Sequence, residues 1–549
     1  MTLVGLSFLA ALRGLGATFY VDAGGQNPMP PYTNWSTAAT NIQDSVDAAT
    51  NGDVILVTNG VYKFGGRVVF GAETNRVVLT NGITLMGVNG ASNTMIVGGA
   101  NLRCVYVGNG SVIAGFTLTN GQTASSGDLT NEQSGGGAWC EPGGVISNCV
   151  VTHNEMAGFH AGLGGGVYGG TVWNCTIISN SAYHGGGVAA AVVFNSLIAS
   201  NSVSSSGLAG GSGAYGCNLS NCQLVGNNGD GNGGGAYNST LNNCVLSNNL
   251  CWYFGGGAYE STLTNCFIYS NYAGNGGGAS HSTLVDCLVV SNVASIGGGV
   301  DFSSVYNCTV VGNRANNIFT AGGVEAYTGP SSVFNSIIYS NYTGSVSNYA
   351  ASVLINSSST WPLPTSGSWN ITNAPLLVNY SNDFRLRSNS PCINSGNNLY
   401  LTNVATDLAG NPRISGGKVD MGAYEFQNPT SLISYAWLQQ YGLALDGSAD
   451  SIDADGDGLN NFQEWRAGTN PTNAASVMQL FSPTNNGSNL VVTWQSVTNI
   501  NYFLMRSLGL VPANFQVIAT NLPGRNGSTS YADTNAPMPG PWFYKVGVQ

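Results

Sequence analysis

Short apolar runs alternate with small polar corners through most of the chain, and between residues 139 and 345 they repeat as one unit. A typical unit is GGGAYNSTLNNCVLSNN, residues 233–249, in which no apolar run exceeds three residues. Such brief alternation, closed at each end by Gly or Asn, predicts short β-strands joined by tight corners. The chain is therefore expected to be an all-β protein built from a repeated coil.

The units align on one slot that usually holds a cysteine. In chain order the slot is occupied by Cys149, Cys175, Ser196, Cys222, Cys244, Cys266, Cys287, Cys308 and Ser336. Five residues after the slot there is always an asparagine: Asn154, Asn180, Asn201, Asn227, Asn249, Asn271, Asn292, Asn313 and Asn341. In seven of these units a glycine lies nine residues before the slot: Gly166, Gly187, Gly213, Gly235, Gly257, Gly278 and Gly299.

A period of about 22 residues predicts a parallel β-helix, in which identical positions of successive coils stack about 4.8 Å apart. Helical repeats such as ankyrin are longer, at roughly 33 residues, and the leucine-rich frame is absent. In a β-helix the glycines permit positive φ at the corners, and the asparagines can form a ladder of amide hydrogen bonds. The pattern thus assigns a structural task to each recurring residue type.

The cysteine column is interpreted as packing. Stacked Cβ atoms on parallel strands do not point at one another, which disfavours disulfides, and no CxxC pair or histidine accompanies the column to suggest a metal. A redox or metal role is the alternative. Cys140, Cys217 and Cys251 lie outside the column, and their pairing stays open.

The two ends of the chain predict different elements. Ile42, Val46 and Ala49 share one face of a short amphipathic helix, which would cap the open N-terminal end of the core. Residues 477–549 contain short alternating strands separated by Gly, Pro and Asn, which predict a small β-sandwich. Residues 1–17 look like a secretory signal, with a short apolar run followed by small residues; a first buried strand is the alternative.

Composition narrows the possible partners. The net charge of −11 argues against nucleic acid, because phosphate binding needs Lys and Arg. With 43% hydrophobic residues and only 7% charged residues, the chain is not expected to be disordered. No later stretch is long and apolar enough for a transmembrane helix, and we expect a monomer.

Residues 18–427 resemble the right-handed parallel β-helix, or pectin-lyase-like, superfamily. The resemblance rests on the repeat and on the opening NWSTAATNIQDSVDAATNGDVILVTNGVY. Within it, residues 18–384 would form the helix, and residues 385–427 are similar to the choice-of-anchor Q domain of secreted bacterial proteins. That similarity is carried by SPCINSGNN and TDLAGNPRISGGKVDMGAYEF within residues 390–426. The sandwich resembles a fibronectin type III module.

Residues 428–476 form a predicted linker that contains a calcium loop. DADGDGLNNFQE, residues 453–464, matches the pattern D-x-D-x-D-G with a glutamate at position twelve. The expected ligands are Asp453, Asp455, Asp457, the Leu459 carbonyl, Asn461 and Glu464. The single copy is similar to the loops of thrombospondin type 3 or dockerin segments, and an acidic solvated turn is the alternative.

One column of side chains, two residues after the glycine corner, suggests a binding face. It contains Trp139, Tyr168, Tyr215, Tyr237 and Tyr259 and then Asp301 and Glu325. By alternation the column is expected to face outward, where aromatic rings can bind sugars or simply stack on one another. Asp301 and Glu325 on adjacent rungs would lie near the spacing of about 5–5.5 Å used by retaining glycosidases, and ordinary solvated acids are the alternative.

These features predict a secreted or cell-surface bacterial protein that binds polysaccharide or mediates adhesion. A polysaccharide lyase or glycoside hydrolase working on the outer face is one alternative, and a structural spacer is the other. The enzyme alternative is weakened because residues 135–341 contain one basic residue, Arg314, whereas lyase chemistry needs an Arg or Lys base beside acidic calcium ligands.

Overall fold

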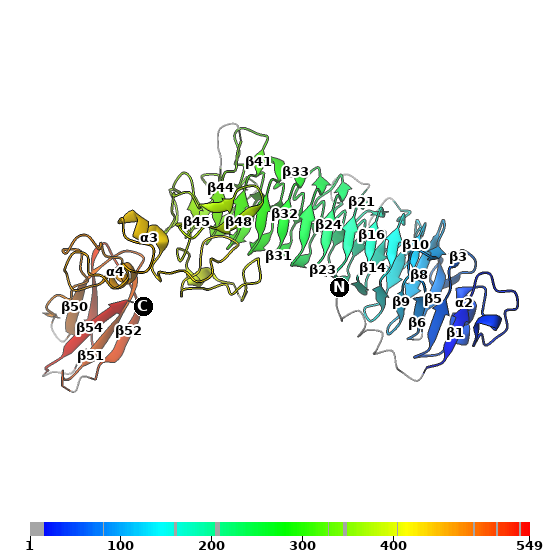
Figure 1. Ribbon diagram of the computed structural model, residues 1–549, viewed down its shortest axis with the longest axis horizontal. Helices are drawn as coiled ribbons and strands as arrows, with labels where there is room; N and C mark the ends of the chain where they lie inside the picture. Colours follow the sequence, from blue (N-terminus) through cyan, green and yellow to red (C-terminus); the bar gives the residue numbers. More distant parts are fainter. Residues whose placement is uncertain are drawn as a thin grey trace.

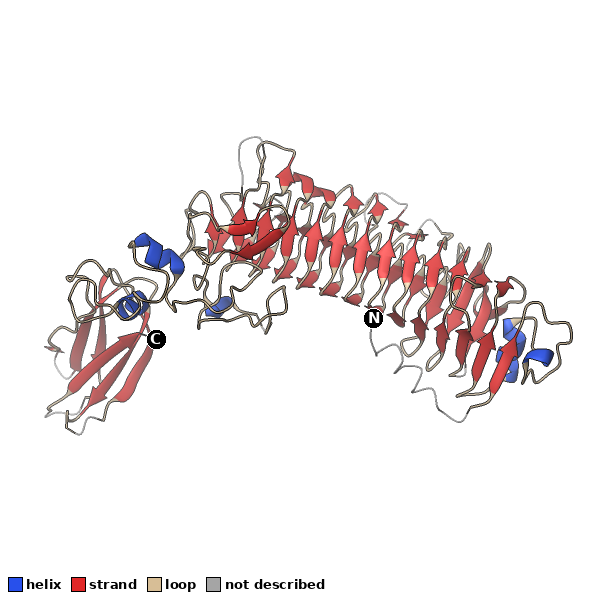
Figure 2. Cartoon of the chain, viewed as in Figure 1, coloured by secondary structure: helices blue, strands red, loops and turns tan. Residues whose placement is uncertain are grey.

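The computed structural model describes residues 16–548 apart from residues 81, 159–161, 204–208, 328, 344–347, 403, 487–488, 512–513 and 537–539. The predicted signal segment therefore lies outside the described residues except for its last two positions. Figure 1 shows a long coil of parallel strands that leads into an irregular region and then a small β-domain. Strands dominate the chain and the helices are few and short (Figure 2).

Three long sheets and one short sheet run along the coil. Sheet A consists of β1 (Thr18–Val21), β2 (Val54–Val57), β6 (Thr84–Gly87), β9 (Val112–Ala114), β12 (Val145–Ser147), β15 (Thr171–Trp173), β19 (Val192–Phe194), β23 (Asn218–Ser220), β27 (Thr240–Asn242), β31 (Thr262–Thr264), β35 (Thr283–Val285), β39 (Ser304–Tyr306), β43 (Ser332–Phe334) and β45 (Leu354–Asn356). Sheet B consists of β3 (Gly60–Tyr62), β7 (Thr94–Val97), β10 (Thr117–Thr119), β13 (Val150–Thr152), β16 (Thr176–Ile178), β20 (Leu197–Ala199), β24 (Gln223–Val225), β28 (Val245–Ser247), β32 (Phe267–Tyr269), β36 (Leu288–Val290), β40 (Thr309–Val311), β44 (Ile337–Tyr339) and β46 (Ser359–Thr360).

The other two sheets complete the coil. Sheet C consists of β4 (Arg67–Phe70), β5 (Glu73–Leu79), β8 (Leu102–Val107), β11 (Ala138–Cys140), β14 (Val167–Tyr168), β18 (Val188–Ala189), β22 (Ala214–Tyr215), β26 (Ala236–Tyr237), β30 (Ala258–Tyr259), β34 (Ala279–Ser280), β38 (Val300–Asp301) and β42 (Val324–Glu325). Sheet D consists of β17 (Ser181–Ala182), β21 (Ser202–Val203), β25 (Asn228–Gly229), β29 (Leu250–Cys251), β33 (Tyr272–Asn275), β37 (Val293–Ile296) and β41 (Arg314–Ala315).

Each turn of the coil visits the sheets in the order C, A, B and D. Identical repeat positions pair across coils, as in Tyr237 with Tyr259 on sheet C and Leu246 with Ile268 on sheet B. All pairings in these sheets are parallel except β4 with β5. The predicted right-handed parallel β-helix with coils of about 22 residues is confirmed.

The glycine corner is explained by how closely one coil approaches the next. Gly233 has φ +61°, and a Cβ on Gly235 would lie only 2.5 Å from the carbonyl oxygen of Gly257 in the following coil. The first position therefore needs a left-handed backbone and the third has no room for a side chain. Glycine is the residue that satisfies both.

The asparagine ladder is present as predicted. The Asn249 Oδ1 accepts hydrogen bonds from the backbone N–H of Asn227 at 3.0 Å and from its Nδ2 at 2.9 Å, and Asn249 donates in the same way to Asn271. The same bonds run from Asn154 through Asn341 and end on Asn348. These amides supply hydrogen-bond partners to the buried backbone groups at the corner of each of these coils.

The cysteine column packs inside the coil. All twelve cysteines are free and buried, so no disulfide is present among them. A second column, at the corner between sheets C and A, begins with Cys217 and continues through Ser239, Ser261, Ser282, Ser303 and Ser331, whose hydroxyls accept backbone N–H groups of the preceding coil. Cys217 thus belongs to a ladder that the sequence analysis did not identify.

The N-terminal end is closed by the predicted helix. The 3₁₀ turn η1 (Trp35–Thr37) precedes α2 (Ile42–Ala48), whose N-cap Asn41 accepts the N–H of Gln43. Ile42, Val46 and the following Ala49 are buried in the same core as the strands. The helix therefore covers apolar residues that the first coil would otherwise expose.

The C-terminal part of the coil is covered by a second core on the outer face of sheet B. The coil strands end with β46, and the chain continues through the hairpin β47 (Leu377–Asn379) and β48 (Asp383–Leu386), the 3₁₀ turn η2 (Asn398–Tyr400) and α3 (Tyr435–Gln440). Leu288 and Ile337 of sheet B are buried against Phe384, Met421 and other residues of this segment. Residues 377–449 therefore pack against the rod.

A buried ion pair fixes this contact. Arg413 Nε lies 3.0 Å from Asp286 Oδ1, and both side chains are almost completely buried. Asp286 occupies a corner position with φ 51° that holds Asn in the coils on either side, at Asn265 and Asn307. Asp286 is the one acid at this corner position, and it is the residue that the Arg413 guanidinium contacts.

The last domain contains two three-stranded antiparallel sheets. One is formed by β49 (Thr484–Asn486), β50 (Asn489–Ser496) and β53 (Gly527–Asp533), and the other by β51 (Asn501–Ser507), β52 (Gln516–Pro523) and β54 (Phe543–Val548). Val492, Trp494, Tyr502 and Leu504 are buried between them. The helix α4 (Asn461–Ala467) lies between this sandwich and the second core.

Candidate binding surface and metal site

The aromatic column predicted from the sequence lies on the outer face of sheet C, where neighbouring rings contact one another edge-on or at a tilt. Ring centroids of Tyr215 and Tyr237 lie 5.2 Å apart, those of Tyr237 and Tyr259 lie 5.1 Å apart, and those of Trp139 and Tyr168 lie 5.9 Å apart. Trp139 is buried and the four tyrosines are half-buried. Much of each ring is therefore covered by its neighbours rather than by solvent.

Two histidines continue the stack where the column lacks a ring. Ala189 interrupts the series, and the His184 imidazole fills the gap with its centroid 4.5 Å from Tyr215. Beyond Tyr259, His281 packs 5.1 Å from that ring. Burial lowers the pKa of both histidines, which favours the neutral imidazole. The stacking interpretation of this column is supported, and a sugar-binding role for it stays a prediction.

Asp301 and Glu325 lie on adjacent rungs of sheet C, as expected from the repeat. Their expected exposure is wrong, because Asp301 is 0% and Glu325 6% exposed. The segments on either side of β42, residues 316–323 and 326–327, form a loop over this position. A catalytic role for the pair stays a prediction.

Both carboxylates serve the covering loop. Glu325 accepts the backbone N–H of Ala321 at 2.7 Å and that of Ala326 at 2.9 Å, and Asp301 Oδ1 accepts the N–H of Tyr327 at 3.0 Å. A general acid must reach the leaving oxygen of the substrate. Here both acids already accept hydrogen bonds from backbone N–H groups of the chain.

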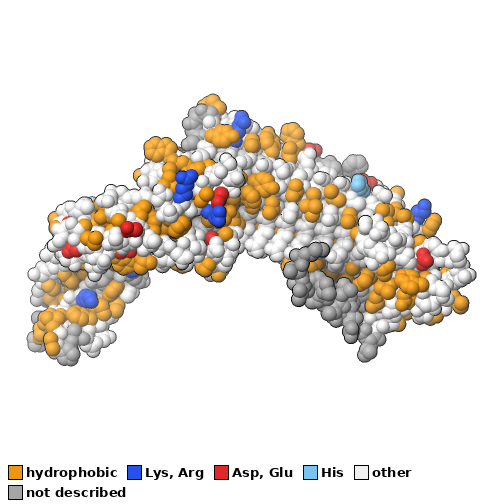
Figure 3. Space-filling model, in the orientation of Figure 1, with side chains coloured by type: hydrophobic (Ala, Val, Ile, Leu, Met, Phe, Trp, Pro, Cys, Tyr) orange, Lys and Arg blue, Asp and Glu red, His pale blue; other side chains and the backbone are white. Residues whose placement is uncertain are grey.

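An exposed aromatic strip lies on the outer face of sheet D, and the sequence analysis did not identify it. Trp252, which follows β29, is 66% exposed, Tyr253 is 45%, Tyr272 of β33 is 40% and Tyr342 is 52% exposed. We call these four residues the aromatic strip. Hydrophobic side chains gather along this upper edge of the molecule, over the strands labelled β33 and β41 in Figure 1 (Figure 3).

The register places Tyr272 one coil after Trp252 and Tyr253, and Tyr342 three coils after Tyr272. Leu250 pairs with Tyr272, then Val293, Arg314 and Tyr342 follow one rung at a time. Residues between them in each strand, such as Ala273 and Ala294, are buried, so the strip points outward. Arg314, the one basic residue of the central coils, is exposed among these rings. The sequence carries a signal for this face: in each sheet D segment the first residue after the ladder asparagine points outward and the second is buried.

The predicted calcium ligands come together in the described structure. Carboxylate oxygens of Asp453, Asp455 and Asp457 all lie within 4.8 Å of one another. Asp453 accepts the N–H groups of Gly456 and Gly458, and Leu459 donates its N–H to Asp457. The loop thus brings its three acids together, with Asp453 exposed and Asp455 and Asp457 half-buried.

Asn461 and Glu464, the other two side chains of the predicted ligand set, lie in α4, which directly follows the loop. Both are completely buried, and four oxygens lack a hydrogen-bond donor: Asp455 Oδ2, Asp457 Oδ2, Asn461 Oδ1 and Glu464 Oε2. Burial, followed by the charges of Asp455 and Asp457, raises the pKa of Glu464 to about 7. Buried oxygens without donors and with mutual repulsion are the donor set that a hard divalent cation satisfies, so the residues fit calcium.

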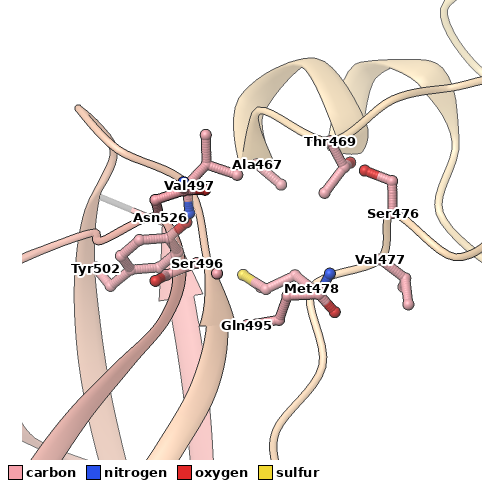
Figure 4. Close-up of a pocket in the computed structure, with 11 residues that line it drawn as sticks. Ala467, Thr469, Ser476, Val477, Met478, Gln495, Ser496, Val497, Tyr502 and Asn526 are labelled. Carbon is pink, nitrogen blue, oxygen red and sulfur yellow. Dashed lines mark hydrogen bonds between the residues drawn. The ribbon is translucent and has the colours of Figure 1, made fainter.

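A hollow of about 190 Å³ lies where α4 meets the sandwich. Ala467 and Thr469 form one side, and Val497 and Tyr502 of the sandwich form the other (Figure 4). Thr469 also donates its hydroxyl to Glu464 Oε1 at 3.3 Å. The wall of this hollow is therefore connected to the acidic loop.

No family model and no curated protein sequence matches the chain. Among solved structures, it is similar to pectate lyase Pel9A (14% identity, 76% of this chain and 97% of that one, TM-score 0.35). It is also similar to the A-module of the mannuronan C-5 epimerase AlgE4 of Azotobacter vinelandii (15%, 63% and 99%, TM-score 0.31) and to XylC in complex with xylose (9%, 75% and 99%, TM-score 0.33). At these values the fold assignment rests on the sheet topology of the chain itself.

Proposed function

We propose that the protein is an extracellular polysaccharide-binding rod that holds a glycan on the aromatic strip of sheet D. The observation that carries the proposal is the exposure of Trp252, Tyr253, Tyr272 and Tyr342 on the sheet D side of the rod. Exposing such rings in water is unfavourable, so a row of them favours a ligand with apolar faces. Pyranose rings present C–H faces of this kind.

The surroundings of the strip favour a sugar. Exposed Asn228, Asp230, Ser295 and Asn316 border the rings and offer donors and acceptors for hydroxyl groups. Backbone pairing to the coils on both sides fixes the position of Tyr272 before a ligand arrives, and Trp252 and Tyr253 lie in the bend that follows β29. Rigid aromatic contacts combined with short polar side chains suit a ligand that is both apolar and rich in hydroxyls.

Non-catalytic binding is preferred over a lyase or hydrolase activity. The one acidic pair of sheet C is buried and accepts backbone N–H groups, and one exposed arginine is the only basic residue of the central coils. A structural spacer is the second alternative, and the mutual stacking of the sheet C tyrosines supports it. The aromatic strip is the feature that a spacer does not explain.

Affinity electrophoresis against neutral and acidic polysaccharides tests the proposal. Trp252→Ala is expected to reduce affinity about tenfold, which corresponds to the loss of roughly 1.4 kcal/mol of ring contact. Trp369→Ala is the matched control, because Trp369 is also exposed, at 48%, but lies outside the strip. Equal loss in both variants, or no retention on any glycan, would contradict the proposal.

We also propose that the loop at residues 453–464 binds calcium. Asp453, Asp455, Asp457, Asn461 and Glu464 would hold the ion together with the Leu459 carbonyl, and the ion would neutralise the clustered acids. The four oxygens without donors support this. Calorimetric titration should give one site that Asp455→Asn abolishes, and equal binding by the variant would refute it.

Further details of the organisation are part of the same proposal. We assign residues 385–427 to a choice-of-anchor Q-like unit, residues 453–464 to a thrombospondin type 3 or dockerin-like loop, and residues 477–549 to a fibronectin type III-like module. The two-sheet arrangement supports the last of these. Within the described residues no helix is long and apolar enough to span a membrane. Secretion and a monomeric state are also proposed, and cell fractionation and light scattering test them.

A further inference from the structure

We propose that calcium binding locks the joint between the β-helix and the C-terminal sandwich, with α4 as the locking element. The inference rests on the calcium site proposed above and extends it from a local loop to the arrangement of two domains. Its basis is that α4 carries two of the ligands and contacts both neighbours of the linker. An ion in the loop would therefore act on both sides of the joint.

The rod side of the joint is built from backbone and apolar contacts. Asn461 donates its Nδ2 to the Ala449 carbonyl at 2.9 Å, and the Phe462 N–H donates to the Asp450 carbonyl at 3.0 Å. Asp450 in turn accepts the Ser431 hydroxyl at 2.7 Å. Phe462 and Trp465 pack against the second core, which lies on sheet B. The first turn of α4 is thus attached to the rod.

The sandwich side is built from the other end of the same helix. Gly468 ends α4 in a left-handed conformation with φ 72°, and a Cβ placed there would lie 3.4 Å from side-chain atoms of both Val497 and Ile500. Ala467 and Thr469 face Tyr502 across the hollow (Figure 4). Because α4 has only seven residues, its two ends cannot be displaced independently.

The ligand set connects these two sides. Glu464 lies in the middle of α4 with its Oε2 buried and without a donor, and carboxylate oxygens of the three loop aspartates lie within 4.8 Å of one another just before the helix. Without a cation these charges repel one another across a poorly hydrated site, which favours opening of the loop. Once the loop opens, Asn461 and Phe462 lose their fixed partners. The sandwich then moves relative to the rod.

Small-angle X-ray scattering of the full chain, combined with limited proteolysis, tests this inference. With calcium we expect a narrow distribution of molecular dimensions and cleavage within residues 443–460 that is about tenfold slower than in chelator. Asp455→Asn should resemble the chelated protein under both conditions. Asp446→Asn is the matched control, because Asp446 is an exposed acid of the same linker and is not a ligand. Magnesium serves as the ionic-strength control.

A second variant separates the joint from the ion site. Val497→Asp places a charge on the sandwich side of the contact and leaves every ligand intact. It should bind calcium in calorimetry yet fail to narrow the scattering distribution. The inference is overturned if the wild-type chain binds calcium while its scattering and cleavage stay unchanged. If the chain binds no calcium, both the proposed calcium site and the proposed locking of the joint are overturned. Glycan binding is measured separately and does not depend on this result.

Discussion

The buried asparagines show how much a single side chain contributes to this fold. Each ladder amide is enclosed by the coil and bonded to the coils before and after it. Asn249 accepts two hydrogen bonds and donates two, one of them to the Leu224 carbonyl. Because buried backbone groups must be paired, the ladder supplies partners that the tight corner cannot supply itself.

Replacing Asn249 by leucine should therefore be costly. The change removes the acceptor of the Asn227 backbone N–H and of one Asn227 amide N–H, and it removes a donor to the Leu224 carbonyl; each group left unpaired costs about 1–3 kcal/mol. We expect a loss of at least about 3 kcal/mol in the free energy of unfolding, measured by urea titration. Asn242→Ala, on the outward side of β27, is the control and should cost less than about 0.5 kcal/mol. Equal effects would show that the ladder is dispensable.

A second group of residues predicts a pH dependence. Asp286, Asp407, Asp420 and Glu425 are buried around a single guanidinium, that of Arg413. Burial raises the pKa of Asp286 to about 7, and burial together with the charge of Asp420 raises the pKa of Glu425. One cation cannot neutralise four acids, so the folded chain retains protons that the unfolded chain releases.

The sign of the effect follows from proton binding. Above the ordinary carboxyl pKa of about 4.5, the folded state holds more protons than the unfolded state, so stability falls as pH rises toward neutral. Thermal unfolding in chelator should give a higher melting temperature at pH 5.5 than at pH 8. Glu425→Gln should reduce that difference. A melting temperature that increases with pH, or an unchanged difference in the variant, would contradict this assignment.

At the scale of the element, the coil keeps its thiols out of reach. Burial raises the pKa of Cys217 to about 11 and that of Cys251 to about 12, and the other cysteines are equally enclosed. Thiol reagents need an accessible thiolate. Ellman's reagent should label fewer than about one thiol per native chain within an hour and all 12 after denaturation. Rapid labelling of several thiols in the native chain would show that the column is open.

The loop formed by residues 316–323 and 326–327, on either side of β42, is a second element with a clear test. Glu325 holds it through two backbone N–H groups, so Glu325→Ala should loosen the loop without unfolding the coil. Limited proteolysis should then cut within this loop at least about fivefold faster. Asp230→Ala, an exposed acid on another coil, should leave the cleavage rate unchanged. If Glu325→Ala instead abolishes a measurable depolymerising activity, the acid has a catalytic role.

The repeat could be predicted because its period is imposed by stacking. Glycine corners, ladder asparagines and the slot cysteines each recur at fixed spacing, and the capping helix follows from Ile42 and Val46. Which outward-facing side chains are buried by other segments of the chain could not be predicted in the same way. Asp301 alternates outward, yet a loop from later in the chain buries it. The packing of residues 377–449 on sheet B depends on contacts between distant segments, such as Arg413 with Asp286.

Trp252 was missed for a related physical reason. It follows the two-residue strand β29 in a coil-specific segment, and no ring occupies the equivalent position, Gly274, of the next coil. Aligning the repeats therefore identifies the tyrosines of sheet C, because they recur at one repeat position. It does not identify the exposed rings of sheet D, because they occupy different positions. The exposed fraction of a side chain depends on the residues that pack around it, and those around Trp252 are known only from the folded structure.

At the scale of the whole molecule, the rod divides its surface into covered and open faces. The second core covers part of sheet B, stacked rings and a loop cover much of sheet C, and the aromatic strip of sheet D is open. Figure 3 shows few charged side chains along the coil, in keeping with a charged content of 7%. A long, weakly charged rod with one open aromatic edge is suited to holding an extended chain.

The most direct test of that claim is quantitative glycan binding by the double variant Trp252→Ala/Tyr272→Ala, with Trp369→Ala as control and new reducing ends and unsaturated uronate measured in the same samples. We predict that the wild-type chain and the control are retained on a polysaccharide, that the double variant loses retention at least about tenfold, and that no cleavage products form. Retention of the double variant at wild-type strength, or cleavage by the wild-type chain, would contradict the account.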